Sequence, residues 1–157
     1  MKTGVAGFVK LESVLNQIVN NLNGYENALK DFGDKLMRSR EVKILMESFQ
    51  IDNFQSGVMP TGLQIGNYDK STVAKKKKEG REYDFVTLYD TGEFYKSIYA
   101  AYGSDTIYID SKDPKLEKIQ AQYGQILGIT EYQMKELANY MRPKFEEFTK
   151  DYIQMSL

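Results

Sequence analysis

The 157-residue sequence contains no cysteine and no histidine. The first absence excludes disulfides, thiolate metal sites and thiol nucleophiles. The second removes the commonest general base, the usual zinc ligand and every nucleophile that depends on a neighbouring imidazole. An enzyme built on this chain would have to use carboxylates, lysine, tyrosine or a carboxylate-bound metal. We therefore expect a non-enzymatic protein with no catalytic residue, no metal site and no cofactor.

Long apolar runs and a strong excess of charge of one sign are also missing. No stretch approaches the roughly 20 apolar residues that a membrane-spanning helix needs, and the single lysine near the N-terminus is not followed by the apolar block of a signal peptide. The formal net charge of −1 gives the whole surface little attraction for nucleic acid or anionic lipid. We expect a protein that is made in a cytoplasm and makes no membrane contact.

What the sequence does contain is aromatic residues, with twelve tyrosines and eight phenylalanines. Tyrosine joins a rigid apolar ring to a polar tip, a combination that suits partly hydrated interfaces. The length fits a single domain over residues 1–157, with or without an arm. Composition therefore favours a protein that works through contacts.

The first part of the chain, residues 1–54, is expected to be helical. Apolar residues recur at helical spacing from Phe8 to Leu22, and Asn23-Gly24 is a typical helix end. A second helix is predicted from Tyr25 to the neighbourhood of Ile51. The sequence thus predicts two N-terminal helices separated at Gly24.

Residues 55–83 lose this periodicity, because several glycines and Pro60 interrupt them. We interpret them as an extended arm or loop, and segments of this length are usually functional. The arm contains more apolar residues than a flexible linker needs, so we expect it to dock on a neighbour. Its predicted contact residues are Leu63, Ile65, Tyr68, Lys75, Lys76, Lys77 and Lys78.

The last part, residues 84–157, is expected to combine strands with C-terminal helices. Residues 85–88 form a short strand candidate, and residues 97–102 and 106–111 predict a hairpin around Gly103-Ser104-Asp105. Tyrosines in this hairpin are further candidates for contact with a partner, namely Tyr99, Tyr102 and Tyr108. Ile107 and Ile109 alternate with Tyr108, which predicts one apolar face.

Two helices are predicted after the hairpin. Asp113-Pro114 is typical of a helix start, and Thr130 with Gln133 forms a capping box for the last helix, which Pro143 should kink. Together these elements predict an α+β fold: N-terminal helices, a long arm, a small antiparallel sheet and C-terminal helices packed on that sheet.

Asp90-Thr91-Gly92 is the tripeptide of aspartic proteases, in which two such loops place two carboxylates close enough to share a proton. Ile126-Leu127-Gly128 resembles a later strand of the retroviral enzymes. The protease interpretation needs an almost all-β fold, however, and Glu93 stands where serine or alanine is expected. We interpret Asp90, Thr91 and Gly92 as a structural turn, and keep a retroviral-type aspartic protease using Asp90 as an alternative.

Lys75 to Lys78 allow a second alternative, a small nucleic-acid-binding module in which the lysines contact phosphates. A lysine run on a loop is more often simply solvated, and no aromatic residues interleave this one as a single-strand-binding surface requires.

Three stretches from Gly62 onward resemble, in order, the phage virion morphogenesis and tail-completion family. Gly66-Asn67-Tyr68 with Thr72 and the lysine run resembles the family's arm, residues 86–98 resemble its block around a Thr-Gly turn and a Ser-Ile strand start, and Ile126-Leu127-Gly128-Ile129-Thr130 resembles its closing helix. The resemblance covers about the last 95 residues.

The resemblance implies a structural virion protein of a tailed phage, a tail-completion or head–tail connector component of the neck. It implies a cyclic homo-oligomer, contacts with portal, connector or tail proteins, and incidental contact with packaged DNA. The expected location is the virion, after synthesis in the host cytoplasm. Such a protein needs a rigid body, a loop that reaches a neighbour and edges that close a ring.

Overall fold

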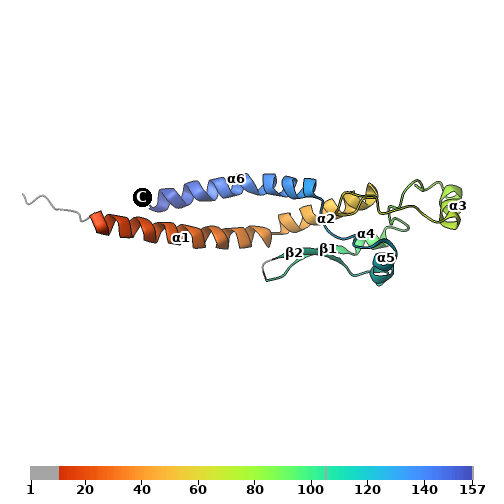
Figure 1. Ribbon diagram of the computed structural model, residues 1–157, viewed down its shortest axis with the longest axis horizontal. Coiled ribbons are helices and arrows are strands. Elements are labelled where there is room, and N and C mark those ends of the chain that lie inside the picture. The colour runs from red at the N-terminus through yellow and green to blue at the C-terminus, as the bar shows by residue number, and fades with distance from the viewer. Residues whose placement is uncertain (1–10, 105, 157) are drawn as a thin grey trace, which may run out of the picture. The chain divides into compact units, whose positions relative to one another are not determined.

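A computed structural model describes residues 11–104 and 106–156 and confirms the predicted α+β class. The elements follow in the order α1 (Leu11–Met37), α2 (Arg40–Gln55), α3 (Lys70–Lys78), α4 (Glu93–Lys96), β1 (Ile98–Tyr102), β2 (Ile107–Ser111), α5 (Leu116–Tyr123) and α6 (Glu131–Ser156) (Figure 1). The chain divides into two compact units. Unit 1 joins residues up to Lys35 with residues from Arg142 onward, and unit 2 comprises Leu36–Met141. Whether the whole chain folds as a single domain stays a prediction.

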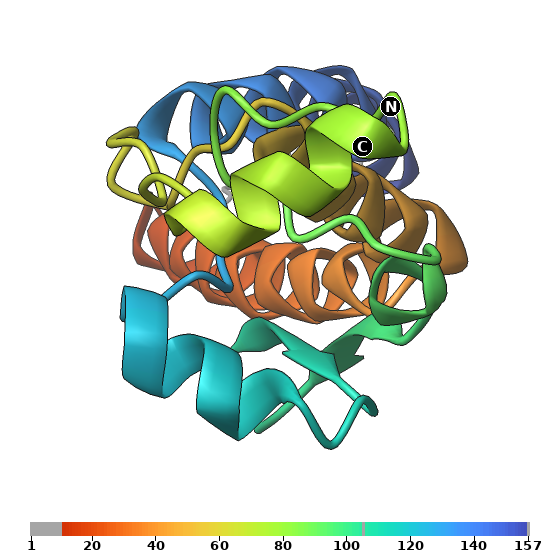
Figure 2. The ribbon, with the colours of Figure 1, turned by 90° about the vertical axis from the view of Figure 1, so that its right-hand side faces the viewer.

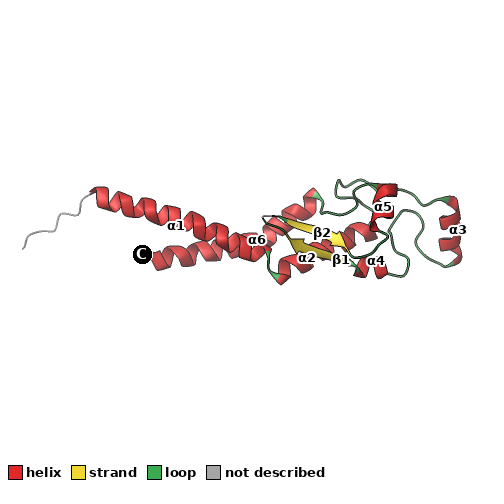
Figure 3. Ribbon diagram, turned by 90° about the horizontal axis from the view of Figure 1, so that it is seen from below, coloured by secondary structure: helices red, strands yellow, loops and turns green. Residues whose placement is uncertain are grey.

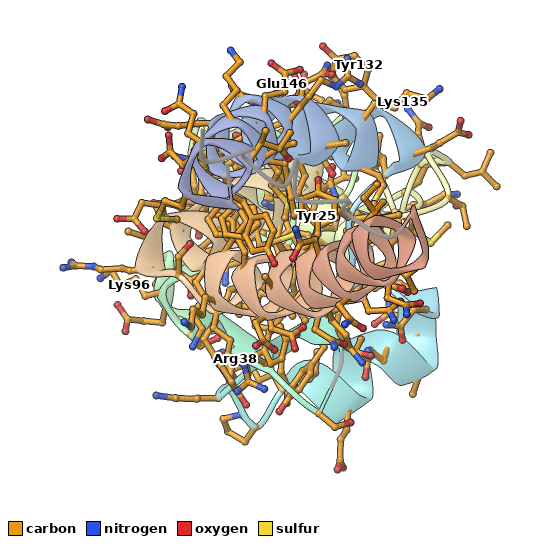
Figure 4. All side chains as sticks on the ribbon, turned by 90° about the vertical axis from the view of Figure 1, so that its left-hand side faces the viewer. Tyr25, Arg38, Lys96, Tyr132, Lys135 and Glu146 are labelled. Carbon is orange, nitrogen blue, oxygen red and sulfur yellow. The ribbon has the colours of Figure 1, made fainter. Side chains whose placement is uncertain are left out.

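Unit 1 is a pair of antiparallel helical segments held together by aromatic rings. Phe32 on α1 stacks on Phe148 of α6, with ring centroids 4.5 Å apart, and meets Phe145 edge to face at 5.2 Å. Further along, Tyr25 lies 5.3 Å from the ring of Tyr152 and shares a 2.9 Å hydrogen bond with the Thr149 hydroxyl. Figure 4 shows Tyr25 between the two helices. Aromatic pairs of this kind add about 0.5–1.5 kcal/mol each beyond the area they bury.

The predicted helix break at Asn23-Gly24 is wrong, because α1 runs unbroken through both residues. Gly24 has a packing role instead: a Cβ at this position would lie 2.9 Å from the hydroxyl oxygen of Tyr152. The break occurs at Arg38–Ser39, where the Ser39 hydroxyl accepts a hydrogen bond from the amide of Val42 and caps α2. Phe8, the first residue of the predicted helix, lies outside the described residues.

Unit 2 contains the buried core. α2 packs on the predicted hairpin, in which β1 and β2 pair antiparallel from Ile98 opposite Ser111 to Tyr102 opposite Ile107 (Figure 3). Ile109 is buried and Tyr108 exposed, which confirms the predicted apolar face. The fully buried side chains at the centre come from α2 and from the loops around the hairpin, and include Val42, Phe54, Val86 and Ile126.

Buried amide side chains fasten α2 to the first turn of α6 and to the segment before it. The Gln50 side chain donates to the Ile126 carbonyl at 3.1 Å and accepts from the Gly128 amide at 2.7 Å. Gln133 donates to the Phe49 carbonyl and to Asn53 Oδ1. Since an unpaired buried amide or carbonyl costs about 1–3 kcal/mol, this satisfied network fixes the path of the chain as well as stabilising it.

The remaining local predictions have mixed outcomes. The capping box is confirmed, because Thr130 and Gln133 exchange hydrogen bonds between side chain and backbone. The helix after Asp113-Pro114 begins only at Leu116, following a turn. Residues 85–88 are not a strand; the Val86 amide instead donates to the Gly66 carbonyl. α6 continues through Pro143, whose predicted kink stays a prediction.

The predicted arm is not wholly extended, because residues 70–78 form α3 (Figure 2). The Asp69 carboxylate supplies the local reason: it accepts hydrogen bonds from the Thr72 amide and from the Ser71 and Thr72 hydroxyls, as an N-cap does. Four lysines in the last turn also favour the negative end of the helix dipole. The lysine run therefore lies on a helix and not on a loop.

Candidate interaction surfaces

The four lysines of α3 do not form one accessible patch. Successive residues on a helix point about 100° apart, so Lys76 points inward and is only 5% exposed, whereas Lys75, Lys77 and Lys78 remain exposed. The Lys77 ammonium lies over the ring of Tyr83. Lys76, which the sequence predicted as a contact residue, is buried in unit 2, and its ammonium binds a carbonyl there.

Lys76 and Tyr68 fasten the predicted arm to residues 87–89. The Lys76 ammonium lies 4.5 Å from the centre of the Tyr68 ring and donates to the Tyr89 carbonyl at 3.1 Å. The Tyr68 hydroxyl accepts a hydrogen bond from the Thr87 amide at 3.0 Å and lies 3.3 Å from the Thr87 hydroxyl. Each group has partners within unit 2, so this cluster stabilises the docked segment.

The pKa values of two partly buried phenols in this cluster, Tyr68 and Tyr95, shift in opposite directions. Burial works to raise the pKa of Tyr68, but hydrogen bonds from Thr87 and the nearby Lys76 ammonium outweigh it and lower the pKa. Burial raises the pKa of Tyr95, whose hydroxyl donates to the Thr87 carbonyl. Tyr95 therefore stays a neutral donor at any physiological pH.

Leu63 and Ile65, predicted together as arm contacts, have different surroundings. Ile65 is 6% exposed within the core of unit 2, where it offers almost no surface to a neighbour. Leu63 is 66% exposed at the end of a tight turn, in which the Met59 amide donates to the Leu63 carbonyl. Of these two residues, Leu63 alone is available to a partner.

Asp90, Thr91 and Gly92 form bends that lead into α4, and Gly92 has a positive φ of 86°. The Asp90 carboxylate is 66% exposed and paired with Arg81, which also contacts Glu79. The hydrogen bond from Arg81 holds the pKa of Asp90 below its ordinary value, and Lys75 and Lys115 act in the same direction. A protease dyad requires the opposite, a pair of carboxylates of which one has a raised pKa.

The hairpin tyrosines differ in availability. Tyr99 donates to Asp110 Oδ2 at 3.1 Å, and this bond raises the pKa of the phenol. The guanidinium of Arg38 lies 4.0 Å from the centre of the Tyr102 ring. Tyr108 is 48% exposed. Tyr108 is therefore the predicted hairpin contact with the most surface to offer.

A larger apolar surface lies on unit 1, where sequence reasoning placed no contact residue. Large apolar side chains of both helices are about half exposed or more, namely Ile18, Val19, Leu22, Ile153 and Met155. A groove of about 330 Å³ is lined by Ile18, Asn21, Leu22, Tyr25, Thr149, Tyr152 and Ile153, without a charged residue. We call this surface of the α1–α6 helix pair the hairpin-end face; the name refers to the helical hairpin of unit 1 and not to the β1–β2 hairpin. In Figure 4, Glu146 points away from the space between the helices, where Tyr25 lies.

A sequence signal for the hairpin-end face did exist. Residues 13–24 contain no charged residue, and asparagine and glutamine replace the lysine and glutamate of an ordinary solvent-exposed helix. Exposed interfaces are depleted in charge at their centre in the same way. The sequence does not show that Thr149, Tyr152 and Ile153 lie beside this stretch, so no contact residue was predicted there.

Comparison with known proteins identifies no relative: no family model matches the chain, and neither the curated proteins nor the solved structures contain a match. Among the described residues, no group of three or more acidic side chains is placed to hold a metal ion. In the same part of the chain, no helix has the length and apolar character required to cross a bilayer.

Proposed function

We propose that this chain is a structural protein of a tailed-phage virion, a tail-completion or head–tail connector component that assembles as a ring through the hairpin-end face. The observation that carries the proposal is an uncharged apolar surface on an antiparallel helix pair, exposed in the single chain. Contiguous apolar surface of this kind marks protein–protein contacts. The occupant we propose is a second copy of the chain.

Charge supports a second copy as the occupant. The lining of the groove is uncharged, so a charged partner surface would lose its hydration without gaining a partner. Copies of this face that meet around the axis of a ring supply apolar side chains bordered by asparagine and glutamine. Polar neutral side chains at the border can form hydrogen bonds across the contact without the desolvation cost of an ion.

The order of the sequence motifs supports the virion assignment. The arm residues, the Thr-Gly block and the segment before α6 follow one another as in the tail-completion family. Segments of all three lie within unit 2, and Gln50 binds the last of them to α2. A protein of this class works through a firm body that presents surfaces to neighbours, and the buried amide network provides firmness of that kind.

The oligomer test compares two substitutions one residue apart on α6. Ile153→Asp places a charge on the hairpin-end face, whereas Gln154→Asp adds the same charge at a neighbouring exposed position that does not line the groove. Light scattering after size-exclusion chromatography should give a multi-subunit mass for the unaltered chain and for Gln154→Asp. Ile153→Asp should give smaller species with unchanged helix content by circular dichroism.

The virion assignment has its own test. Antibody labelling of purified phage particles should locate the protein at the neck, between head and tail, and particles lacking it should have separated heads and tails. A strictly monomeric chain that is absent from particles would refute the proposal.

A further inference from the structure

The two edges of the β1–β2 hairpin have different neighbours in unit 2. On the β1 side, the Ala100 amide donates to Glu47 Oε1 of α2 at 2.9 Å, so a side chain occupies the edge that another strand could have used. Within the described residues, no strand pairs with the far side of β2. Two-stranded sheets are marginal on their own, and an unpaired edge is a template for strand addition.

The register identifies which groups of β2 are unpaired. The Lys112 amide donates to the Ser97 carbonyl, and the Gly103 amide donates to the Thr106 carbonyl. Counting from these two pairs, every second pair of opposing residues in the hairpin is hydrogen-bonded. The backbone groups of Ile107 and Ile109 consequently point away from β1. Two amides and two carbonyls are thus presented at the spacing that an added strand requires.

An apolar groove runs along this edge. Its volume is about 530 Å³, and it lies between β2 and residues 125–129. The lining is Met37, Met46, Thr106, Ile107, Tyr108, Ile109, Gln125, Leu127, Gly128, Ile129, Met134 and Leu137, in which no residue is charged. Methionine adapts its shape to different partners. The groove therefore suits an uncharged segment whose backbone can pair with β2.

We propose that residues 3–9 of a second copy occupy this groove as a third strand beside β2. This inference relies on the proposed function only in taking another copy as the partner. Residues 1–10 lie outside the described part, and residues 3–9 read Thr-Gly-Val-Ala-Gly-Phe-Val, without a charge. At about 3.3 Å per residue, seven extended residues reach about 23 Å, enough to run beside the five-residue β2.

The chemistry of this segment matches the groove. Val5, Phe8 and Val9 have side chains that favour strands, and glycine allows close approach of a backbone to its neighbours. Main-chain hydrogen bonds to Ile107 and Ile109 would supply affinity, and the uncharged groove would select against charged segments. Because donor and acceptor are different surfaces, each copy can give one strand and receive another, which is the requirement for closing a ring.

The absence of native cysteine allows a direct crosslinking test. Tyr108→Cys places a thiol on β2 at a side chain that is 48% exposed, and a second full-length chain carries one cysteine at each position from 3 to 9 in turn. Adjacent strands place opposing Cβ atoms about 4.5–5.5 Å apart, close enough for a disulfide. After mild oxidation of a mixture, we expect a disulfide-linked heterodimer whose yield alternates along the segment.

Two controls separate this contact from chance collision and from the hairpin-end face. Tyr132→Cys is 69% exposed on α6 and outside the groove, so it should crosslink at least tenfold less. Met134→Arg, which charges the groove lining at a 55% exposed position, should suppress the heterodimer. Ile153→Asp should leave it in place, because the two surfaces are separate.

Several results would overturn the inference. Yields equal to the Tyr132→Cys level mean that residues 3–9 do not occupy the groove. A chain that carries both Tyr108→Cys and a cysteine in residues 3–9 provides a further comparison. If a disulfide forms within that chain and none forms between the two singly substituted chains, the segment inserts into its own molecule. Rings that dissociate with Ile153→Asp, in the absence of any crosslink, would leave the proposed function standing and refute the strand addition.

Discussion

Unit 1 and unit 2 bury their apolar residues in different ways. Unit 2 encloses Phe54, Val42 and Ile126 completely and ties its segments with buried amides. Unit 1 has one row of rings between two helices and leaves Leu22 and Ile153 in solvent. Unit 2 is therefore the closely packed part, and unit 1 leaves apolar surface exposed, as the proposed function requires.

The largest expected effect tests the firmness of unit 2. Phe54→Ala removes a fully buried ring that contacts Phe94 and Tyr95, and should lower the free energy of unfolding by about 3–5 kcal/mol. Phe148→Ala in unit 1 removes a ring that is only partly buried and should cost less, about 1–2 kcal/mol. Urea titration followed by circular dichroism measures both, and an equal loss would contradict the comparison.

Buried polar contacts should show the next largest difference. Gln50→Leu keeps the side-chain volume but leaves the Ile126 carbonyl and the Gly128 amide unpaired, at a cost of about 2–4 kcal/mol. The counterpart in unit 1 is Tyr25→Phe, which removes the hydrogen bond to Thr149 from a part-buried site.

Because water can replace that bond, Tyr25→Phe should cost under about 1 kcal/mol. Hydrogen exchange adds a local readout: amides of residues 126–129 should lose protection in Gln50→Leu and keep it in Tyr25→Phe. Unchanged protection in Gln50→Leu would mean that the amide network does not hold this segment.

A smaller effect on stability is expected where α3 packs against the Tyr89 carbonyl and the Tyr68 ring within unit 2. Lys76→Met keeps most of the apolar stem and removes the ammonium that binds the Tyr89 carbonyl and the Tyr68 ring, so we expect a loss of about 1 kcal/mol. Lys77→Met, one residue along the same helix and exposed, should change stability by less than about 0.5 kcal/mol. Equal stabilities would mean that Lys76 does not anchor α3.

Short-range signals in the sequence predicted much of this fold correctly. The hairpin rests on β-rich runs flanking a glycine turn, and the cap of α6 rests on Thr130 and Gln133, three residues apart. Both are set by neighbouring residues. The α+β class follows from such signals taken together.

The errors arose where contacts distant in sequence decide the outcome. Gly24 resembles a helix end locally, but Tyr152 packs against it and the helix continues. Lys76 belongs to a charged run, but the Tyr68 ring and the Tyr89 carbonyl bind its ammonium in the interior of unit 2. The uncharged residues 13–24 marked one half of the hairpin-end face. Its pairing with α6, like the β2 groove, could not be predicted, because each joins residues more than 50 positions apart.

The smallest expected effect concerns the cap of α3, a helix in which Lys76 is the buried residue. Hydrogen bonds from Ser71 and Thr72 lower the pKa of Asp69 to about 2. Because this pKa lies below the ordinary value of about 3.9, the cap contributes stability above pH 4 and loses it as the pH falls from about 4 to about 2. Hydrogen exchange at the Thr72 and Val73 amides should therefore become less protected over that interval. Asp69→Asn keeps a cap without a titrating group, so its protection should not follow that change, and an identical profile in both proteins would show that another carboxylate controls this end of α3.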